Sequence, residues 1–135
     1  MNTHIMVKGL RVAIIGVGMT PIRRKWDKSA RELGLMAISE AMKVAGIEAH
    51  DIDAIFTVPQ GYLVDPDEVD RFATQRLGEY LFTETKAQAI IDIGGMSSLS
   101  ALKFAMYEIL LGRCNIALVY ACLLYTSDAA DDGES

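Results

Sequence analysis

The sequence has little cysteine and histidine and no excess of positive charge, and each shortage excludes a class of protein. Only two of its 135 residues are cysteines (Cys114 and Cys122) and two are histidines, so neither a disulfide framework nor a metal site is expected. The formal charge of -5 provides no basic surface for nucleic acid. No apolar run reaches the roughly 18 residues that a membrane span needs. Met1 to Leu10 lacks the pattern of a signal peptide, so we expect a cytoplasmic location.

Apolar segments of two kinds alternate along the rest of the chain. Short runs rich in β-branched residues are typical of buried strands, and longer stretches with apolar residues at three- and four-residue steps are typical of helices. This order predicts one α/β domain with a mostly parallel sheet and helices on both faces. The expected strands are 11–16, 52–58, 87–93 and 115–121, and the expected helices are 29–45, 67–80 and 97–111.

The clearest helix follows Ser29. Ser29 and Glu32 have the spacing of a capping box, in which each side chain accepts a backbone N–H at the start of a helix. Gly46 stands where a helix commonly ends with a left-handed residue. One apolar stripe lies between these signals and predicts a helix with one face against a core. Its members are Ala30, Leu33, Ala37, Ile38, Ala41, Met42 and Ala45.

The expected helix 97–111 differs because its apolar residues lie on nearly every side. A helix that is apolar all round is buried, whereas an ordinary doubly wound sheet exposes the outer face of each helix. In a chain of 135 residues, the cover for such a helix has to come from a second domain or subunit. Gly112 marks the end of the helix. Its apolar residues are Leu99, Ala101, Leu102, Phe104, Ala105, Met106, Ile109, Leu110 and Leu111.

The character of the sequence changes abruptly at Cys122. The first eleven residues from there match the translation of a transposon-type sequencing adapter, and such segments are excluded from reasoning about a fold. A native acidic tail is the alternative. We expect that residues 122–135 are not native and that the native reading frame continues beyond Ala121.

Three segments in order resemble the thiolase superfamily, and in particular its lipid-transfer-protein type. Val12–Pro21 resembles the opening strand and glycine-rich turn of that group. Ala41–Ala54, with its AGI and DID motifs, is similar to the group's link from first helix to second strand. Ile93–Val119 is similar to its glycine turn, apolar helix, Gly-Arg pair and following strand. The likeness covers essentially all of residues 10–121.

The resemblance implies a fold of two similar halves stacked in layers, with the third helix of each half between the two sheets. Residues 1–121 would be the N-terminal half, and helix 97–111 would be the buried third helix. The implied activity is that of an acyl-CoA acyltransferase of lipid metabolism, such as an acetyl-CoA acetyltransferase. Such an enzyme makes or breaks a carbon–carbon bond next to a thioester. The coenzyme A thioester is then the substrate, no further cofactor is needed, and a homodimer is expected.

The sequence departs from the family at the nucleophile. In a typical thiolase the turn before the buried helix carries a cysteine, because a helix N-terminus favours the thiolate that attacks the thioester. Matching Ala101, Leu102 and Ala105 to the family pattern places Gly95 at that position, so no catalytic residue is identified. Backbone amides of this turn could donate to a substrate carbonyl oxygen. The expected substrate-binding residues are Gly94, Gly95, Met96 and Ser97.

Three functions stay open for such a chain. The first is the acyl transfer of the family, and the second is retro-aldol cleavage of acyl-CoA. Cys-less proteins of this fold include such aldolases, and they often work with a small zinc-ribbon and OB-fold protein. The third is a non-catalytic acyl-binding or scaffold subunit. Ser97 or Ser98 would need a nearby base to act as a nucleophile, so a capping role is preferred. For Gly94 and Gly95 a plain turn with positive φ is the alternative.

Other candidate sites are weaker. Gly16-Val17-Gly18 begins a dinucleotide fingerprint, but Pro21 occupies the third glycine position and excludes it. Arg23–Trp26 could contact the phosphates of coenzyme A, although a solvated basic surface is the simpler interpretation. His50 has no partner at metal or acid–base spacing, and Cys114 is expected to be a small buried apolar residue.

Overall fold

Residues 54–58 form the centre of a parallel sheet, as their apolar, β-branched composition predicts. The computed structural model describes residues 11–23, 27–28, 30–58, 87–93 and 96–121. Strand β1 (Ala54–Val58) pairs in parallel with β2 (Ala87–Ile90) on one side and with β3 (Ala117–Ala121) on the other. All three strands lie within predicted ranges, so the α/β fold with a parallel sheet is confirmed.

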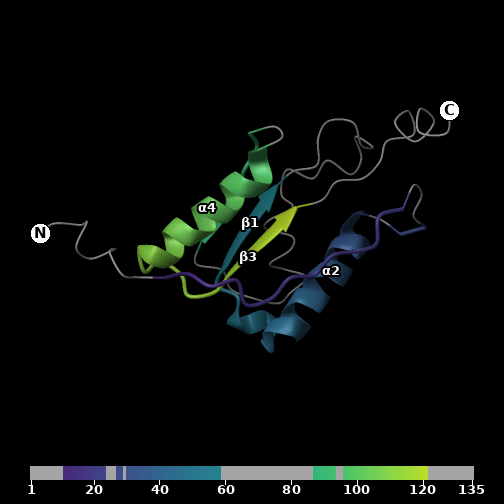
Figure 1. Cartoon of the computed structure of the whole chain (residues 1–135), viewed down its shortest axis with the longest axis horizontal. Helices are drawn as coiled ribbons and strands as arrows, with labels where there is room; N and C mark the ends of the chain where they lie inside the picture. The colour runs from purple at the N-terminus through teal and green to yellow at the C-terminus, as the bar shows by residue number, and fades with distance from the viewer. Residues whose placement is uncertain (1–10, 24–26, 29, 59–86, 94–95, 122–135) are drawn as a thin grey trace, which may run out of the picture.

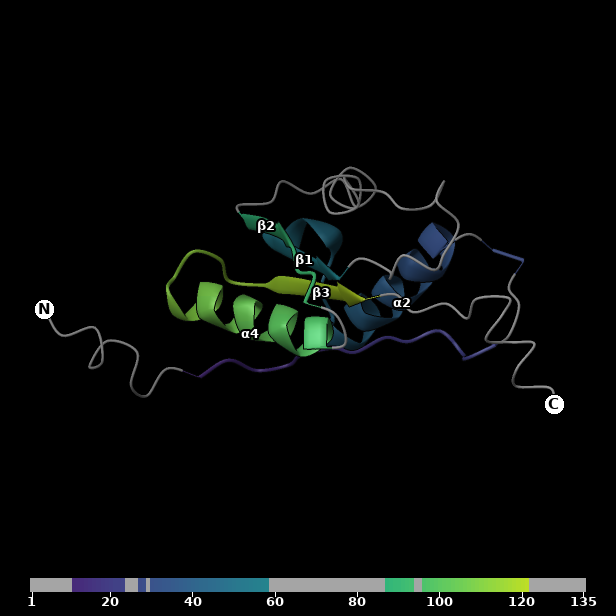
Figure 2. The same ribbon diagram turned by 90° about the horizontal axis from the view of Figure 1, so that it is seen from above.

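Two helices cover opposite faces of this sheet. Figure 1 shows the strands between α2 (Ala30–Ala45) and α4 (Ser97–Leu110). Seen from above, α4 lies alongside β3 (Figure 2). Both helices occupy predicted positions, and together with the sheet they form three layers.

Successive residues of β1 point to opposite faces of the sheet and so enter different cores. Ala54 and Phe56 face α4, while Ile55 faces α2, and all three are at most 2% exposed. The core on the α4 side also contains Ile91, Ala101, Ala105 and Cys114. The core on the α2 side also contains Ile38 and Ile52. Because both faces of β1 are covered, its residues are buried on both sides, and all of them except Thr57 are apolar.

Both helices end in the same glycine motif. Gly46 follows α2 with φ at +69°, and its N–H donates to the Lys43 carbonyl at 3.3 Å. The next N–H, that of Ile47, donates to the Met42 carbonyl at 3.1 Å, so two carbonyls without helical partners are satisfied. The same two bonds close α4 at 3.0 Å each, with Gly112 and Arg113 as donors and Ile109 and Glu108 as acceptors. Both glycine predictions are confirmed.

The first predicted strand is wrong: residues 11–23 run across α2 without joining the sheet (Figure 1). Up to Gly18, none of the backbone groups in this segment bonds to another described residue, and the Met19 N–H donates to a Glu40 carboxylate oxygen at 3.4 Å. The segment passes so close to α2 that a Cβ atom on Gly18 would overlap the Ala37 carbonyl oxygen. An apolar β-branched run forms a strand only where a neighbouring strand pairs with its backbone. No described strand lies beside this one.

Some expectations fall outside the described residues. These are the helix 67–80, the tail 122–135 and the capping serine at position 29. A short 3-10 helix, η1 (Ala49–Asp51), links α2 to β1 and was not predicted.

Candidate functional site

The carboxyl ends of the three parallel strands meet at one edge of the sheet, the edge at which sites form in open α/β folds. β1, β2 and β3 end there at Val58, Ile90 and Ala121. In Figure 1 the arrowheads of β1 and β3 point toward the end of the molecule at which α4 begins. Ile93 and Met96, the described residues on either side of Gly94 and Gly95, therefore lie near the carboxyl edge of the sheet and at the N-terminus of α4.

Ser97 ties the end of the β2 segment to the first turn of α4. Its side chain is buried at 3% exposure, and its Oγ accepts the Ile93 N–H at 2.7 Å. Met96 occupies the N-cap position of α4, and no side-chain hydrogen bond caps the helix. The cap predicted for Ser97 or Ser98 is therefore wrong, because the Ser97 hydroxyl holds the preceding turn instead. A buried hydroxyl that is already engaged is also poorly placed to act as a nucleophile.

Of the other three predicted substrate residues, Met96 lies within the described part of the chain. Gly94 and Gly95 lie outside the described residues, so their role stays a prediction. On either side of them, Ile93 and Met96 present apolar side chains that are each 58% exposed. The two described residues that flank Gly94 and Gly95 are thus accessible and apolar.

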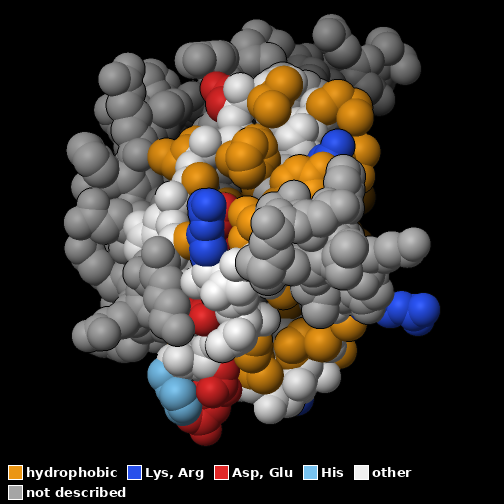
Figure 3. Space-filling model, turned by 90° about the vertical axis from the view of Figure 1, so that its left-hand side faces the viewer, with side chains coloured by type: hydrophobic (Ala, Val, Ile, Leu, Met, Phe, Trp, Pro, Cys, Tyr) orange, Lys and Arg blue, Asp and Glu red, His pale blue; other side chains and the backbone are white. Residues whose placement is uncertain are grey.

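The outward face of α4 is apolar and uncovered by any described residue. Only Ser97, Ala101 and Ala105 of this helix are buried, at steps of four residues along the face that meets the sheet. Figure 3 views the molecule from the side on which α4 lies, and apolar side chains occupy much of the described surface. The exposed apolar residues of the helix are Leu99, Leu102, Phe104, Met106 and Tyr107. The apolar character predicted for every side of this helix is present, and its outer half faces solvent.

Asp53 fastens β1 to β3 at the opposite, amino edge of the sheet. Its Oδ1 accepts the Ile116 N–H at 2.9 Å and the Asn115 N–H at 3.1 Å, and its Oδ2 lies 3.0 Å from the same Asn115 nitrogen. The Asp53 N–H in turn donates to the Ile116 carbonyl at 3.0 Å. In the sequence, Asp53 stands out only as part of the DID motif. A carboxylate directly before an apolar strand is the signal that could have indicated this role.

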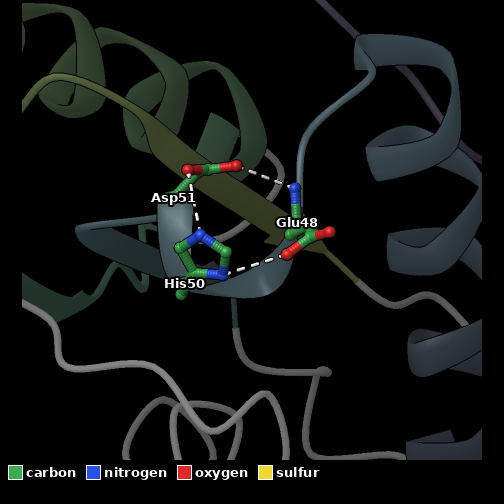
Figure 4. Close-up of polar contacts among 3 residues, drawn as sticks. All are labelled: Glu48, His50 and Asp51. Atoms are coloured by element: carbon green, nitrogen blue, oxygen red, sulfur yellow. Dashed lines mark hydrogen bonds and ion pairs between the residues drawn. The ribbon is translucent and has the colours of Figure 1, made fainter.

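His50 lies between two carboxylates in η1 (Figure 4). Its Nδ1 is 3.2 Å from Glu48 Oε2, and its Nε2 is 3.5 Å from Asp51 Oδ1. The prediction that His50 has no acid–base partner is therefore wrong. The cluster nevertheless lies in the link before β1, at the amino edge, and the His50 side chain is 70% exposed. Its geometry therefore favours a surface role in the link between α2 and β1.

The remaining candidates have simple roles. Cys114 is a free cysteine at 3% exposure in the core below α4, so its predicted apolar role is confirmed. Arg23 is exposed, and the rest of its basic segment lies outside the described residues.

Within the described ranges no group of three acidic, histidine or cysteine side chains is arranged to hold a metal ion. None of the described helices is both long and apolar enough to cross a membrane.

No family model matches this chain, but two curated acetyl-CoA acetyltransferases are similar to it in sequence. The protein from Methanocaldococcus jannaschii is 28% identical over 110 residues, which are 80% of this chain and 27% of that protein. The protein from Methanothermobacter thermautotrophicus is 27% identical over 93 residues, which are 67% of this chain and 24% of that protein. The chain thus spans about a quarter of the length of these relatives.

Solved structures share the fold at lower identity. The Ltp2-ChsH2(DUF35) aldolase is 19% identical with a TM-score of 0.68, over 90% of this chain and 32% of that one. The acetyl-CoA acetyltransferase from Syntrophomonas wolfei is 22% identical with a TM-score of 0.63, over 78% of this chain and 27% of that one. The priming β-ketosynthase of the R1128 polyketide pathway is 17% identical with a TM-score of 0.67, over 85% of this chain and 44% of that one. At these identities the structural likeness establishes the fold.

Proposed function

We propose that the protein is a thiolase-like acyl-CoA acyltransferase. The likeness of the chain to the thiolase superfamily is confirmed. The protein makes or breaks a carbon–carbon bond next to a thioester. The observation that carries this proposal is the similarity to the acetyl-CoA acetyltransferase from Methanocaldococcus jannaschii over 80% of the chain. The coenzyme A thioester is the substrate, and the reaction needs no further cofactor.

The substrate binds where β2 leads into α4. The N-terminus of α4 offers backbone N–H groups without helical partners, and such groups stabilise a carbonyl oxygen that gains negative charge. Ser97 supports this placement because its buried hydroxyl accepts the Ile93 N–H and so fixes both ends of the turn. The residues assigned to the substrate are Gly94, Gly95, Met96 and Ser97.

A specific feature favours a second function, acyl-CoA retro-aldol cleavage. Gly95 stands where the family pattern has its cysteine, and a glycine cannot form an acyl-enzyme. Retro-aldol cleavage needs no nucleophile. A base removes the hydroxyl proton of a 3-hydroxyacyl-CoA, the bond between C2 and C3 breaks, and its electron pair forms the thioester enolate, which is then protonated. The aldolase that shares this fold over 90% of the chain supports the alternative. A non-catalytic acyl-binding subunit is the third possibility.

The test uses the protein expressed from its gene, resequenced through and beyond Ala121. We expect it to cleave acetoacetyl-CoA with free coenzyme A as the acceptor. Cleavage of 3-hydroxyacyl-CoA alone would replace the acyltransferase with the retro-aldolase. Binding of acyl-CoA without either reaction would leave the scaffold function. A frame that ends at Ser135 would contradict the enzyme assignment for this gene product.

A cysteine introduced at the turn locates the nucleophile position. If Gly95 occupies that position, Gly95→Cys gains a covalent acyl adduct after incubation with acetyl-CoA, detected by mass spectrometry of the intact protein. The matched control is Ser98→Cys, three residues along the chain. Equal labelling of both variants would mean that the thiols simply react with the thioester, and the assignment of Gly95 would fail.

The proposal also includes the oligomeric state and the location of the protein. We expect a cytoplasmic homodimer, and for the aldolase alternative a small partner with a zinc ribbon and an OB-fold. Sedimentation of the full protein, alone and with such a partner, tests both expectations. A monomer would contradict the first.

The 135-residue chain by itself should be inactive and prone to aggregate. The outer face of α4 and the exposed apolar side chains of residues 11–22 leave too much apolar surface in water. A product that stays monodisperse as its concentration is raised would contradict this expectation. Sedimentation velocity over a range of concentrations measures it, and unfolding can still be followed in dilute solution before the chain associates.

A further inference from the structure

The backbone leaves the sheet between β2 and α4, and a side chain of the helix holds it there. Just after β2, the Ile91 N–H still donates to the Thr57 carbonyl at 2.9 Å. Two residues later, the Ile93 N–H donates to the Ser97 Oγ at 2.7 Å, a short distance for a bond of this kind. The first turn of α4 therefore holds backbone that the sheet no longer holds.

The two partners of this bond differ in their exposure to water. The Ser97 side chain is 3% exposed, whereas Ile93 is 58% exposed. Ser97 is placed by the packing of its helix, because it begins the buried row that continues with Ala101 and Ala105 against the sheet. The hydroxyl is thus fixed in the interior, and the exposed backbone is attached to it.

The bond spans residues that would otherwise be weakly restrained. Three residues separate the partners, and two of them are the glycines Gly94 and Gly95, the residue type that loses the most conformational freedom when its backbone is fixed. The third, Met96, is the N-cap of α4 and makes no capping bond with its side chain. A bridge from Ile93 to Ser97 reduces the number of conformations open to these residues before a substrate arrives.

We propose that Ser97 is a positioning residue, whose hydroxyl acts on the substrate only through the backbone between Ile93 and α4. The inference rests on the function proposed above and defines the part of Ser97 in it. Negative charge develops on the thioester carbonyl oxygen both in acyl transfer and when retro-aldol cleavage forms an enolate. Backbone N–H groups stabilise that charge best when they are aligned beforehand, so the serine serves either reaction.

Two other roles of Ser97 agree less well with its contacts. A direct hydrogen bond to the substrate would require the hydroxyl to reach the surface, and it is 97% buried. A purely structural role would make the bond important for stability. Ile93 is exposed, however, so water can replace the lost acceptor of its N–H at little cost. Turnover should therefore suffer more than stability.

The test uses the full protein expressed from its gene, with four substitutions. Ser97→Ala removes the acceptor. Ser97→Thr and Ser97→Val add nearly the same volume at this buried position, and only the threonine keeps a hydroxyl, so their difference reports the hydrogen bond and not the packing. The matched control is Ser98→Ala, because Ser98 is adjacent and exposed. Circular dichroism checks that each variant is folded.

Hydrogen exchange measures the bond itself and does not depend on activity. Overlapping peptides that differ by Ile93 are followed by mass spectrometry. We expect the Ile93 amide to exchange about tenfold faster in Ser97→Ala and Ser97→Val than in the wild type, as the loss of one hydrogen bond implies. Ser97→Thr and Ser98→Ala should keep the wild-type rate.

Steady-state kinetics measure the consequence for catalysis. The substrate is the one that the wild-type protein turns over, either acetoacetyl-CoA with coenzyme A or a 3-hydroxyacyl-CoA. We expect kcat to fall on the order of tenfold in Ser97→Ala and Ser97→Val, while KM changes by less than about threefold, since alignment matters most in the transition state. Ser97→Thr should restore most of the lost turnover.

Four results would overturn the proposal. Unchanged exchange at Ile93 in Ser97→Ala would show that the bond does not hold this backbone in solution. Faster exchange with unchanged kcat would reduce Ser97 to a structural residue. A raised KM at constant kcat would mean that the hydroxyl binds the substrate directly. A wild-type protein that catalyses neither reaction would refute the proposed function, and faster exchange in Ser97→Ala would then assign the bond to structure alone.

Discussion

α2 and α4 lie on opposite faces of one sheet and end in the same glycine motif, yet their outer faces differ. Polar and charged residues predominate on the outer face of α2, among them Glu32, Ser39, Glu40 and Lys43. On α4 the outer face carries Leu99, Leu102, Met106 and Tyr107 around one lysine. The inner faces of both helices determine how this domain packs. The outer face of α4 indicates what the domain packs against.

The largest expected difference in stability is between a substitution on the inner face of α2 and one on the outer face of α4. Ile38→Ala removes a side chain that is 3% exposed and packs against Ile52 and Ile55, so it should lower the free energy of unfolding by about 3 kcal/mol. Leu99→Ala shortens an exposed side chain and should change it by less than about 0.5 kcal/mol. Urea unfolding followed by circular dichroism measures both. Equal effects would mean that the outer face of α4 is already packed in this chain.

The next largest loss of stability is expected at the amino edge of the sheet. Asp53→Ala leaves the Asn115 and Ile116 N–H groups without their carboxylate acceptor and should cost about 1.5 kcal/mol. Asp51→Ala removes the acceptor of the exposed Glu48 N–H and should cost less, since water replaces it readily. The same urea titration compares the two variants. A larger loss for Asp51→Ala would contradict the assignment of Asp53 as the residue that fastens β1 to β3.

Substitutions at the ends of the two helices should lower stability equally, unlike substitutions on their faces. Gly46→Ala and Gly112→Ala each force a Cβ atom onto a residue with φ near +70°. Nothing lies within 4 Å of the place that a Cβ atom would take at either glycine, so backbone strain alone should set the cost at roughly 1 kcal/mol. Matching shifts of the thermal midpoint would support this. Unequal shifts would show that one of the two turns carries additional contacts.

The smallest effect on stability is expected where residues 11–23 cross α2. Gly18→Ala would push a Cβ atom into the Ala37 carbonyl oxygen and should move this segment off the helix. The segment contributes few contacts to the two cores, so the free energy of unfolding should change by less than about 0.5 kcal/mol. Faster trypsin cleavage at Arg23 would report the movement. An unchanged cleavage rate with a large loss of stability would contradict this description.

The elements that could be predicted from sequence are those whose signals are local. The apolar run 54–58 forms the central strand because both its faces are covered, and Gly46 and Gly112 end helices because their backbone conformation favours glycine. The run 11–16 carries the same apolar signal and forms no strand. Pairing depends on a neighbour, and sequence composition does not specify one.

The site was predicted less completely than the fold. The position of the turn follows from the order of β2 and α4, but the role of Ser97 depends on which way its hydroxyl points. A serine next to a helix start predicts a cap, whereas Ser97 accepts an N–H from the preceding turn. Glu48 and Asp51 stand beside His50 in the sequence, but the sequence does not show that their carboxylates turn toward its ring nitrogens, at 3.2 and 3.5 Å.

The central position of β1 has a consequence for synthesis of the protein on the ribosome. β1 is translated before both of its partners, and its pairing with β3 requires residues as far as Ala121. Until then Ile55 and Phe56 have no complete core to enter, and exposed apolar segments of this kind make nascent chains prone to aggregate. Slower translation between β1 and β3 should therefore lower the yield of soluble protein, while slower translation before β1 should have little effect.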